Sequence, residues 1–334
     1  MKILITGAFG NLGQNAIRAA FNLQQNLELI CYDIKTTSTM KSRERLLYLK
    51  NKKEFKTIWG DILDREKLTQ ALEGVDAVIH LAAILHPKTE KNPDLAYKIN
   101  VEGTENIINS IKSCFKDSPP NKMPKIILSS SVSLYGPQAP TRDLISKDTP
   151  IHPTDVYTRT KEQAEKIVKK SGLPWIIFRI TGAPALSLFS TELMDLVFEI
   201  PLRQQIEFIH PKDVGVALIN AAVRDIKNKL FLIGGGERCQ ITNRELISAF
   251  FKGFGLKMPS DDSFKIPQNK EEWFYVGWLD TTESQRLLEY QRHTLDDFLE
   301  DLREEVGWKR IIFKLFNPLI KKYLEVKSPY RKSK

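Results

Sequence analysis

Residues 1–20, MKILITGAFGNLGQNAIRAA, decide the fold. An apolar, β-branched run from Lys2 to Thr6 is followed by three closely spaced glycines and then by apolar residues at helical spacing. This order predicts a strand, a tight turn and a helix. Gly7 can supply the turn, Gly10 lets backbone N–H groups approach a pyrophosphate, and Gly13 allows the helix to pack close to the strand. The positive end of the helix would then face the phosphates.

A second strand is expected at Glu28–Tyr32, and it ends at Asp33, about twenty residues beyond the last of these glycines. An acid at this place accepts hydrogen bonds from the adenosine ribose of a dinucleotide and repels a 2′-phosphate. The sequence therefore predicts NAD in preference to NADP. Asp33 could instead cap a solvent loop, and Lys35, Lys41 and Arg43 could still hold a phosphate.

Strand-like and helical stretches alternate through most of the chain. Buried parallel strands are expected at Ala77–Leu81, Lys125–Leu128, Trp175–Arg179 and Lys229–Ile233. Helices fit between them, notably Val101–Cys114 and Tyr157–Lys170. This alternation predicts an α/β fold with a Rossmann-like, doubly wound parallel sheet.

The chain has 334 residues, which is longer than one ordinary domain, and 42% of them are hydrophobic, as in a compact protein. We expect an NAD-binding domain at residues 1–184 and 206–236, since the late strand returns to the sheet. A smaller, discontinuous substrate-binding lobe is expected at 185–205 and 237–308, followed by a basic amphipathic tail at 309–334.

A candidate reactive pair lies in residues 155–170, DVYTRTKEQAEKIVKK, where Tyr157 and Lys161 are one helical turn apart. When a secondary alcohol is oxidised, its hydride leaves from carbon and a base must accept the hydroxyl proton. Lowering the pKa of a tyrosine from about 10 to roughly 7 requires about 4 kcal/mol. One positive charge at ~4 Å and an effective dielectric near 20 supplies about that much, and an oxidised nicotinamide adds a second charge. Alone, the pair could also be a surface aromatic packed on a lysine stem.

An ordered set of motifs resembles the extended short-chain dehydrogenases, also called the NAD-dependent epimerase/dehydratase family, over most of the chain. The motifs are Thr6–Gly13, Gly60–Ile62, His80–Ala83, Asn100–Thr104, Ser129–Ser131 with Tyr135-Gly136, Tyr157 with Lys161, and Ile209–Val214. The resemblance implies an enzyme in which Ser131, Tyr157 and Lys161 are catalytic. Ser131 would hold the substrate oxygen against Tyr157, while Ser129 and Ser130 would contact backbone or cofactor.

The resemblance also implies a set of dinucleotide contacts. Asp61 and Ile62 would border the adenine, and the segment from Leu81 to Ala83 would pass beneath the cofactor. Asp61 could instead, or in addition, be a helix N-cap before Arg65. The complete expected set is Gly7, Phe9, Gly10, Asn11, Leu12, Gly13, Asp33, Asp61, Ile62, Leu81, Ala82, Ala83, Asn100, Ser129, Tyr157 and Lys161.

Departures from the family pattern bear on the substrate. Sugar-nucleotide epimerases often carry an Asn three residues after the arginine of the sixth strand, whereas here Arg179 is followed by Ile180-Thr181-Gly182. The segment 184–210 is also short, so a bulky uridine or thymidine diphosphate site is in doubt. Dehydration is disfavoured because Val132–Leu134 offers no acid beside the catalytic serine. Epimerisation, alcohol oxidation and ketone reduction remain.

Three functions are compatible with these residues. The first is an NAD-dependent oxidoreductase or epimerase that acts on a sugar-like alcohol, free or nucleotide-linked. The second is a dehydrogenase or reductase of a lipophilic alcohol or ketone at a membrane surface. The third is a cofactor-sensing protein without turnover, against which the intact Ser131, Tyr157 and Lys161 count.

Positive charge concentrates at the end of the chain. Residues 309–334 hold nine basic residues and one acidic residue, a net charge of +8, whereas residues 1–308 hold 41 and 40. Apolar residues from Ile311 to Leu324 recur at helical spacing with lysines between them. Such a helix can lie on an anionic membrane surface. It could instead pack on the second lobe, kinked at Pro318 and followed by a solvated lysine tail.

Other partners and ligands are not expected. The basic residues are not interleaved with stacking aromatics in any recognisable nucleic-acid module. The three cysteines are odd in number and far apart, which predicts reduced thiols in a cytoplasm rather than disulfides. The five histidines show no ligand spacing, so we expect no metal. A strand that begins at Lys2 leaves no room for a signal peptide, and no apolar run is long enough to span a membrane.

A homodimer is expected from the same resemblance. In that family two subunits commonly pair through the helix with the Tyr and Lys and the helix before it, here Tyr157–Lys170 and Val101–Cys114. Apolar positions on these helices are available for the core or for the interface. They are Ile107, Ile108, Ile111, Ala164, Ile167 and Val168.

Overall fold

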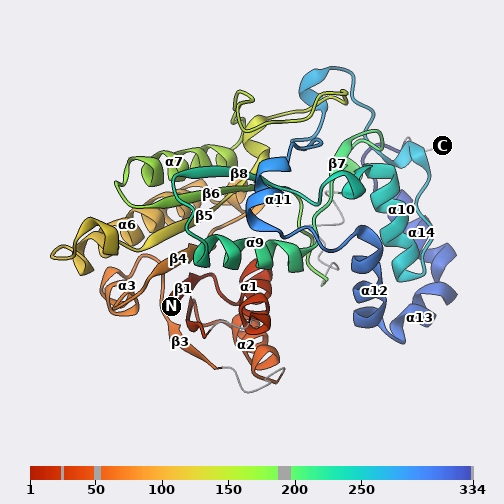
Figure 1. Ribbon diagram of the computed structural model, residues 1–334. Coiled ribbons are helices and arrows are strands. Elements are labelled where there is room, and N and C mark those ends of the chain that lie inside the picture. Colours follow the sequence, from red (N-terminus) through yellow and green to blue (C-terminus); the bar gives the residue numbers. More distant parts are fainter. Residues whose placement is uncertain (24–25, 49–53, 187–196, 332–334) are drawn as a thin grey trace.

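The structure, a computed structural model, describes residues 1–23, 26–48, 54–186 and 197–331. Seven parallel strands form one sheet in the order β3-β2-β1-β4-β5-β6-β8 (Figure 1). They are β1 (Lys2–Thr6), β2 (Glu28–Asp33), β3 (Phe55–Trp59), β4 (Ala77–His80), β5 (Lys125–Ser131), β6 (Trp175–Ile180) and β8 (Lys229–Ile233). The strand order reverses between β1 and β4, and ligands bind at the carboxyl ends of strands at such a point. The predicted doubly wound parallel sheet is confirmed.

Helices cover both faces of this sheet (Figure 1). Successive side chains of a strand point to opposite faces, and both sets are buried here. Ile5 and Ile79 belong to a core cluster that also includes residues of α1, α2, α9 and α11, whereas Leu4 and Val78 belong to one that includes residues of α3, α6 and α7. The first group is α1 (Asn11–Asn22), α2 (Thr37–Tyr48), α9 (Pro211–Val223) and α11 (Thr282–Leu288). The second group is α3 (Arg65–Ala71), α6 (Gly103–Cys114) and α7 (Val156–Lys170).

The connection between β4 and α6 is more irregular than the sequence pattern predicts. It contains the short helices α4 (Lys88–Lys91) and α5 (Pro93–Tyr97), and then a π-helical turn at Lys98–Glu102. The helix expected from Val101 therefore begins, as an α-helix, only at Gly103. Turns of this wide pitch often occur at functional sites, and this one carries Asn100.

A second lobe is built from the later part of the chain. Its small antiparallel sheet pairs β7 (Gln205–Glu207) with β9 (Gln240–Thr242), and its helices include α10 (Asn243–Phe254) and α12 (Leu295–Val306). A reciprocal cap between Thr242 and Glu245 starts α10. Phe208, Phe254 and Phe298 fill the core between these elements. Residues 187–196 of the predicted lobe lie outside the described part of the chain.

The basic tail forms two helices instead of one kinked helix. These are α13 (Lys309–Leu315) and α14 (Asn317–Lys327), with Pro318 in the first turn of α14. A proline is tolerated there because its missing N–H would have no helical partner. Among the helices that the structure describes, none combines the length and the apolar character needed to cross a membrane.

Candidate active site

The glycine turn between β1 and α1 leaves no space for side chains. Gly7 has a φ of +65°, and a Cβ atom there would lie 2.8 Å from the amide nitrogen of Ala82. A Cβ atom on Gly13 would lie 2.5 Å from the carbonyl oxygen of Ala8. Gly10 precedes α1, and no described side chain caps that helix. The turn therefore presents bare backbone and a helix N-terminus, which suits a phosphate.

Asp33 at the end of β2 holds this turn in place. Its Oδ2 accepts a hydrogen bond from the amide of Phe9 at 2.8 Å, and its Oδ1 accepts one from Ile34 at 2.8 Å. Burial raises the pKa of Asp33, although both amide hydrogen bonds oppose that rise. Arg43, a candidate phosphate ligand, donates from Nε to Thr57 Oγ1 at 2.9 Å. Asp33 thus lies in the cleft and not in a solvent loop.

The segment after β3 forms the next part of the wall. Asp61 and Ile62 both line the cleft. Asp61 accepts from the amide of Leu63 at 2.9 Å, whereas Asp64 caps α3 by accepting from Lys67 at 3.1 Å. The alternative of Asp61 as a helix N-cap is therefore wrong, since the capping residue is three positions later.

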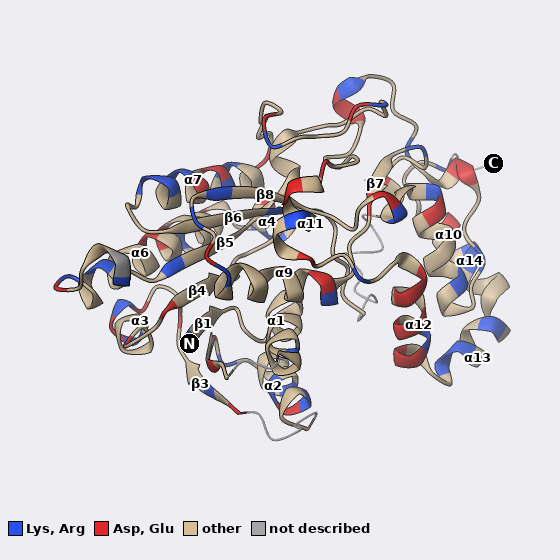
Figure 2. Cartoon of the chain, viewed as in Figure 1, with Lys and Arg blue, Asp and Glu red and all other residues tan. Residues whose placement is uncertain are grey.

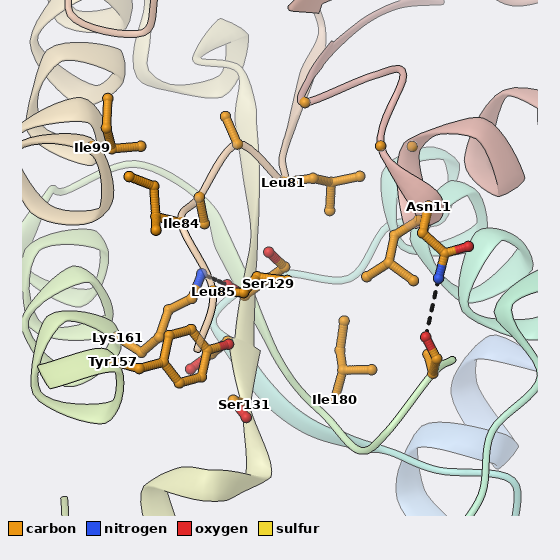
Figure 3. Close-up of a pocket in the computed structure, with 18 of the residues that line it drawn as sticks. Asn11, Leu81, Ile84, Leu85, Ile99, Ser129, Ser131, Tyr157, Lys161 and Ile180 are labelled. Carbon is orange, nitrogen blue, oxygen red and sulfur yellow. Dashed lines mark hydrogen bonds between the residues drawn. The ribbon is translucent and has the colours of Figure 1, made fainter. Parts of the chain in front are cut away.

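Ser131, Tyr157 and Lys161 meet at the other end of the cleft (Figure 3). Ser131 ends β5, and the capping box of Asp155 with Thr158 starts α7, so Tyr157 lies in the first helical turn and Lys161 one turn later. The Ser131 hydroxyl donates to Ser133 Oγ at 3.0 Å and accepts from the amide of Ser133 at 3.1 Å. Lys161 donates from Nζ to the carbonyl of Ser129 at 2.9 Å.

Burial controls the protonation of this group. It raises the pKa of Tyr157 to about 12, against a lowering by the neighbouring Ser131 hydroxyl. It also lowers the pKa of Lys161 to about 8, against a raising by Glu165. Lys161 Nζ lies 6.0 Å from the centre of the Tyr157 ring. The expected lowering of the tyrosine pKa is thus outweighed, among the protein's own groups, by the desolvation of the phenol.

Behind the serines lies a buried ion pair that the sequence did not reveal. Arg179 on β6 donates to both carboxylate oxygens of Glu165 on α7, at 2.9 and 2.8 Å. Ser130 donates to Glu165 at 2.7 Å, and Arg179 also donates to the hydroxyl of Tyr135 at 2.9 Å. Burial would raise the pKa of Glu165, but Arg179 and Ser130 hold it below its usual range. The network fixes α7 to the ends of β5 and β6.

Two predicted cofactor-binding residues do not line the cleft. The side chain of Phe9 is buried in the core, with its ring centre 5.2 Å from that of Trp59. The Asn100 side-chain amide instead bonds to both main-chain groups of Ile84. Its oxygen accepts from the Ile84 N–H at 2.8 Å, and its nitrogen donates to the Ile84 carbonyl at 3.0 Å. Asn100 also donates to Thr160 Oγ1 on α7 at 3.0 Å. It therefore connects the loop after β4 to the helix of the reactive pair.

Both ends belong to one cleft with a cavity volume of about 750 Å³. Except for Phe9 and Asn100, every predicted site residue lines it. An apolar wall that the sequence did not predict also lines it, and Figure 3 shows part of that wall beside Tyr157 and Lys161. We define this wall as Ile84, Leu85, Leu95, Ile99, Phe274 and Val276. Its last two members come from the second half of the chain, so no local pattern could have identified them.

The position of the missing nucleotide-contacting Asn is also part of the cleft. Gly182 lines it, three residues after Arg179, and a Cβ atom there would have no neighbour within 4 Å. The preceding Thr181 donates from Oγ1 to the carbonyl of Glu207 at 2.9 Å. A hydrogen bond to β7 of the second lobe therefore fixes the backbone next to Gly182, and the space where a side chain would point is empty.

Three potential metal ligands lie together although their spacing in the sequence gave no sign of it. Ligand atoms of His86, Glu90 and Asp155 are within 4.8 Å of one another. Both carboxylates already accept hydrogen bonds, Glu90 from the amide of Val156 at 3.0 Å and Asp155 from that of Thr158 at 2.7 Å. Since these contacts explain the cluster as part of the start of α7, we assign no metal to it.

The sequence and the fold have relatives among known proteins. UDP-glucose 4-epimerase of Lactobacillus helveticus is 28% identical over 193 residues, which cover 55% of this chain and 53% of that enzyme. An uncharacterized membrane protein of Methanocaldococcus jannaschii is 26% identical over 246 residues, which cover 70% of this chain and 64% of that protein. The chain thus spans less than two thirds of the length of these curated relatives.

A solved structure shows the same fold over nearly the whole chain. The crystal structure of UDP-glucose-4-epimerase from Stenotrophomonas maltophila, with bound NAD and formylated UDP-arabinopyranose, matches with a TM-score of 0.74 at 21% identity. The match covers 94% of this chain and 99% of that one.

A family model also matches residues 4–173, which include the glycine turn, Asp33 and the Ser131, Tyr157 and Lys161 group. The resemblance to the extended short-chain dehydrogenases is confirmed by these matches. Since the matched segment is half of the chain, this protein belongs to the 3-beta hydroxysteroid dehydrogenase/isomerase family.

Proposed function

We propose that this protein is an NAD-dependent oxidoreductase or epimerase that moves a hydride to or from a secondary alcohol carbon. The observation that carries the proposal is the convergence of two sites in one cleft. The bare glycine turn with Asp33 lies at one end, and Ser131, Tyr157 and Lys161 lie at the other. A dinucleotide could occupy both ends, because its phosphates would lie at the glycine turn and its reactive nicotinamide ring would lie beside Tyr157.

The residues present suit NAD. The turn has no room for side chains at Gly7 and Gly13, so backbone N–H groups would hold the pyrophosphate. Asp33 would accept hydrogen bonds from the adenosine ribose, and its charge would repel the 2′-phosphate of NADP. The solved epimerase from Stenotrophomonas maltophila carries NAD, which supports the same cofactor here.

The chain's own residues would then handle the proton. Bound NAD would supply the hydride acceptor for oxidation of the substrate carbon, and Tyr157 would accept the proton of the substrate hydroxyl. Ser131 would hold the reacting oxygen in hydrogen-bond range of Tyr157. With its pKa near 12, the phenol is protonated at neutral pH, so it is ready to donate in the reductive direction. In the oxidative direction it needs the added positive charge of the oxidised nicotinamide.

The first candidate substrate is a sugar-like alcohol, free or nucleotide-linked, as in the related epimerases. Gly182 in place of the nucleotide-contacting Asn removes one expected contact with a nucleotide. The apolar wall favours a second candidate, a lipophilic alcohol or ketone, because apolar side chains beside Tyr157 gain by excluding water from an apolar substrate. A cofactor-sensing protein without turnover would not need Ser131, Tyr157 and Lys161 in one cleft.

We also propose a homodimer through the outer sides of α6 and α7. Five of the six apolar positions considered for that interface are instead buried in the core under the sheet: Ile107, Ile108, Ile111, Ala164 and Val168. The interface would therefore use the more polar surfaces of these helices. Light scattering at micromolar concentration tests this proposal, and a monomer mass would count against it.

Calorimetric titration with NADH and with NADPH tests the function first. We expect both to bind in the cleft, with NADH tighter. A thermal-shift screen with NAD present would then compare nucleotides, nucleotide sugars and sterol-like ketones, because a ligand of the native state raises apparent stability. Tighter binding of NADPH would overturn the role of Asp33. Failure of both dinucleotides to bind would overturn the enzyme assignment.

A further inference from the structure

The two C-terminal helices are attached to the second lobe by one face only. The ring of Phe313 on α13 packs edge-on against Phe254, with centres 6.5 Å apart. On α14, Leu324 is buried beside Phe264, and Ile320 packs against the same cluster. The alternative in which the tail packs on the second lobe is therefore correct for this inner face.

The opposite face of both helices is apolar and exposed. Trp308, Ile311 and Leu315 recur at intervals of three and four residues, and so do Leu319, Tyr323 and Val326 on α14. Trp308, Leu315 and Leu319 are 69%, 74% and 66% exposed. Single exposed apolar residues are ordinary, but apolar residues that recur on the exposed side of two consecutive helices indicate an interaction site. We call this surface the outer face: Trp308, Ile311, Leu315, Phe316, Leu319, Tyr323 and Val326.

Positive charge borders the outer face. Lys309, Lys314 and Lys322 are exposed on the same two helices. The one acidic residue in 309–334, Glu325, is buried, and it accepts hydrogen bonds from the amide of Ser260 and from Arg331. In Figure 2 basic residues mark α13 and α14, whereas acidic residues gather on the neighbouring α12. The charge is thus asymmetric across the end of the lobe.

We propose that the outer face docks on the surface of an anionic lipid bilayer. Apolar side chains of an interfacial helix enter the boundary between headgroups and acyl chains, while lysines at its border contact anionic headgroups. A second copy of the chain is a poorer occupant, because it would bring two tails of net charge +8 together. Repulsion of the acidic α12 from the same lipids would orient the molecule with α13 and α14 against the membrane. This proposal does not depend on cofactor binding or turnover.

Flotation of the full chain with vesicles tests the proposal directly. We expect binding to vesicles of phosphatidylcholine mixed with phosphatidylserine, and much weaker binding to phosphatidylcholine alone. Raised salt should weaken binding to the anionic vesicles, since it screens the lysines. A blue shift of tryptophan emission on binding should disappear in Trp308→Phe, which identifies the inserted side chain among five tryptophans.

Paired variants separate the outer face from general effects. Leu315→Ser with Leu319→Ser should reduce vesicle binding at least tenfold without changing the melting temperature, because both side chains are exposed. The matched control is Tyr48→Ser, an exposed apolar side chain on α2, which should bind as the unchanged protein does. Lys309→Glu with Lys314→Glu should lose the preference for anionic vesicles. Exposed lysines elsewhere, changed in Lys56→Glu with Lys227→Glu, are its control.

Three results would overturn the proposal. The first is no binding to anionic vesicles. The second is equal binding by the Leu315→Ser, Leu319→Ser variant and the unchanged protein. The third is a mass above that of the monomer, measured by light scattering without lipid, that decreases in the Leu315→Ser, Leu319→Ser variant. Such a result would mean that a second copy of the chain occupies the outer face. Since none of these measurements involves NAD or a substrate, failure here is distinct from failure of the proposed function.

Discussion

Lys161 donates a hydrogen bond from its buried ammonium to the main-chain carbonyl of Ser129 at 2.9 Å. This bond joins α7 to the end of β5, so the lysine is fixed by backbone that cannot rotate away. Its ammonium thereby lies 6.0 Å from the centre of the Tyr157 ring. The lysine is therefore a structural part of the site. Its removal should change cofactor affinity as well as turnover, whereas removal of the Tyr157 hydroxyl should change turnover alone.

Tyr157→Phe should reduce turnover by ~10²–10⁴-fold, which is the typical value of general acid–base catalysis. Cofactor affinity should change little, because the ring still packs and most expected dinucleotide contacts lie elsewhere. Steady-state kinetics and calorimetry check the two parts. Tyr290→Phe is a suitable control, since it removes a buried hydroxyl that donates to Gly234 at 3.0 Å outside the cleft. Near-normal rates in Tyr157→Phe would refute the proposed proton transfer.

Lys161→Met should lower turnover and cofactor affinity together. The lysine is expected both to favour the phenolate and to contact the nicotinamide ribose. A lower kcat with unchanged dinucleotide affinity would limit Lys161 to the first role. The comparison with Tyr157→Phe thus assigns each residue its function from the same two measurements.

Lys161 should also make stability depend on pH. Burial lowers its pKa from 10.5 to about 8, so between these values the unfolded chain binds more protons than the folded one. Stability therefore rises with pH across this window. Relative to Lys161→Met, the unchanged protein should gain roughly 2 kcal/mol of unfolding free energy between about pH 8 and 10. Denaturant titrations at several pH values check this difference. A fall in unfolding free energy over the same pH range, relative to Lys161→Met, would contradict the burial of a titrating lysine.

Asp33→Asn should shift cofactor preference toward NADP. The amide can still accept from Phe9, but it no longer repels a 2′-phosphate. We expect the ratio of NADPH to NADH affinity to rise about tenfold, or ~1.4 kcal/mol. Asp64→Asn changes an acid that caps α3 outside the cleft, so it should leave that ratio unchanged. Calorimetric titration of both variants decides the matter, and equal ratios would remove Asp33 from the specificity argument.

Glu165→Gln should destabilise the fold by about 3–5 kcal/mol, because it leaves the buried guanidinium of Arg179 without a counter-charge. Glu162→Gln is a control on the same helix, and its partly exposed pair with Lys166 should cost at most about 1 kcal/mol. The Glu165 pair stabilises above the usual carboxyl pKa of 4.5, and this contribution is lost as pH falls through the lowered folded value. Urea unfolding at neutral and acidic pH measures both effects.

Local signals in the sequence predicted much of the fold and the site. Gly13 is required by contacts within one strand-turn-helix unit, Gly7 by the positive φ of its turn, and the pair Tyr157 and Lys161 by one helical turn. Both signals depend on residues close in sequence, where periodicity is informative. The same reasoning placed Asp33, since it lies at the end of the next strand.

What the sequence could not predict depends on tertiary contacts. The pair of Glu165 and Arg179 forms only when α7 packs on β6, and Phe274 reaches the cleft from a distant loop. The raised pKa of Tyr157 is of the same kind, because desolvation is a property of the packed site. The sequence suggested Asp61 as a helix cap, whereas the start of α3 makes Asp64 the capping residue.

The three hydrogen bonds of Asn100 join the main chain of Ile84, in the apolar wall of the cleft, to the helix of Tyr157. A ligand that presses on Ile84 cannot move it without also pulling Thr160, three residues from the reactive phenol. The positions of the apolar wall and of the reactive helix are therefore coupled through an amide that does not line the cleft.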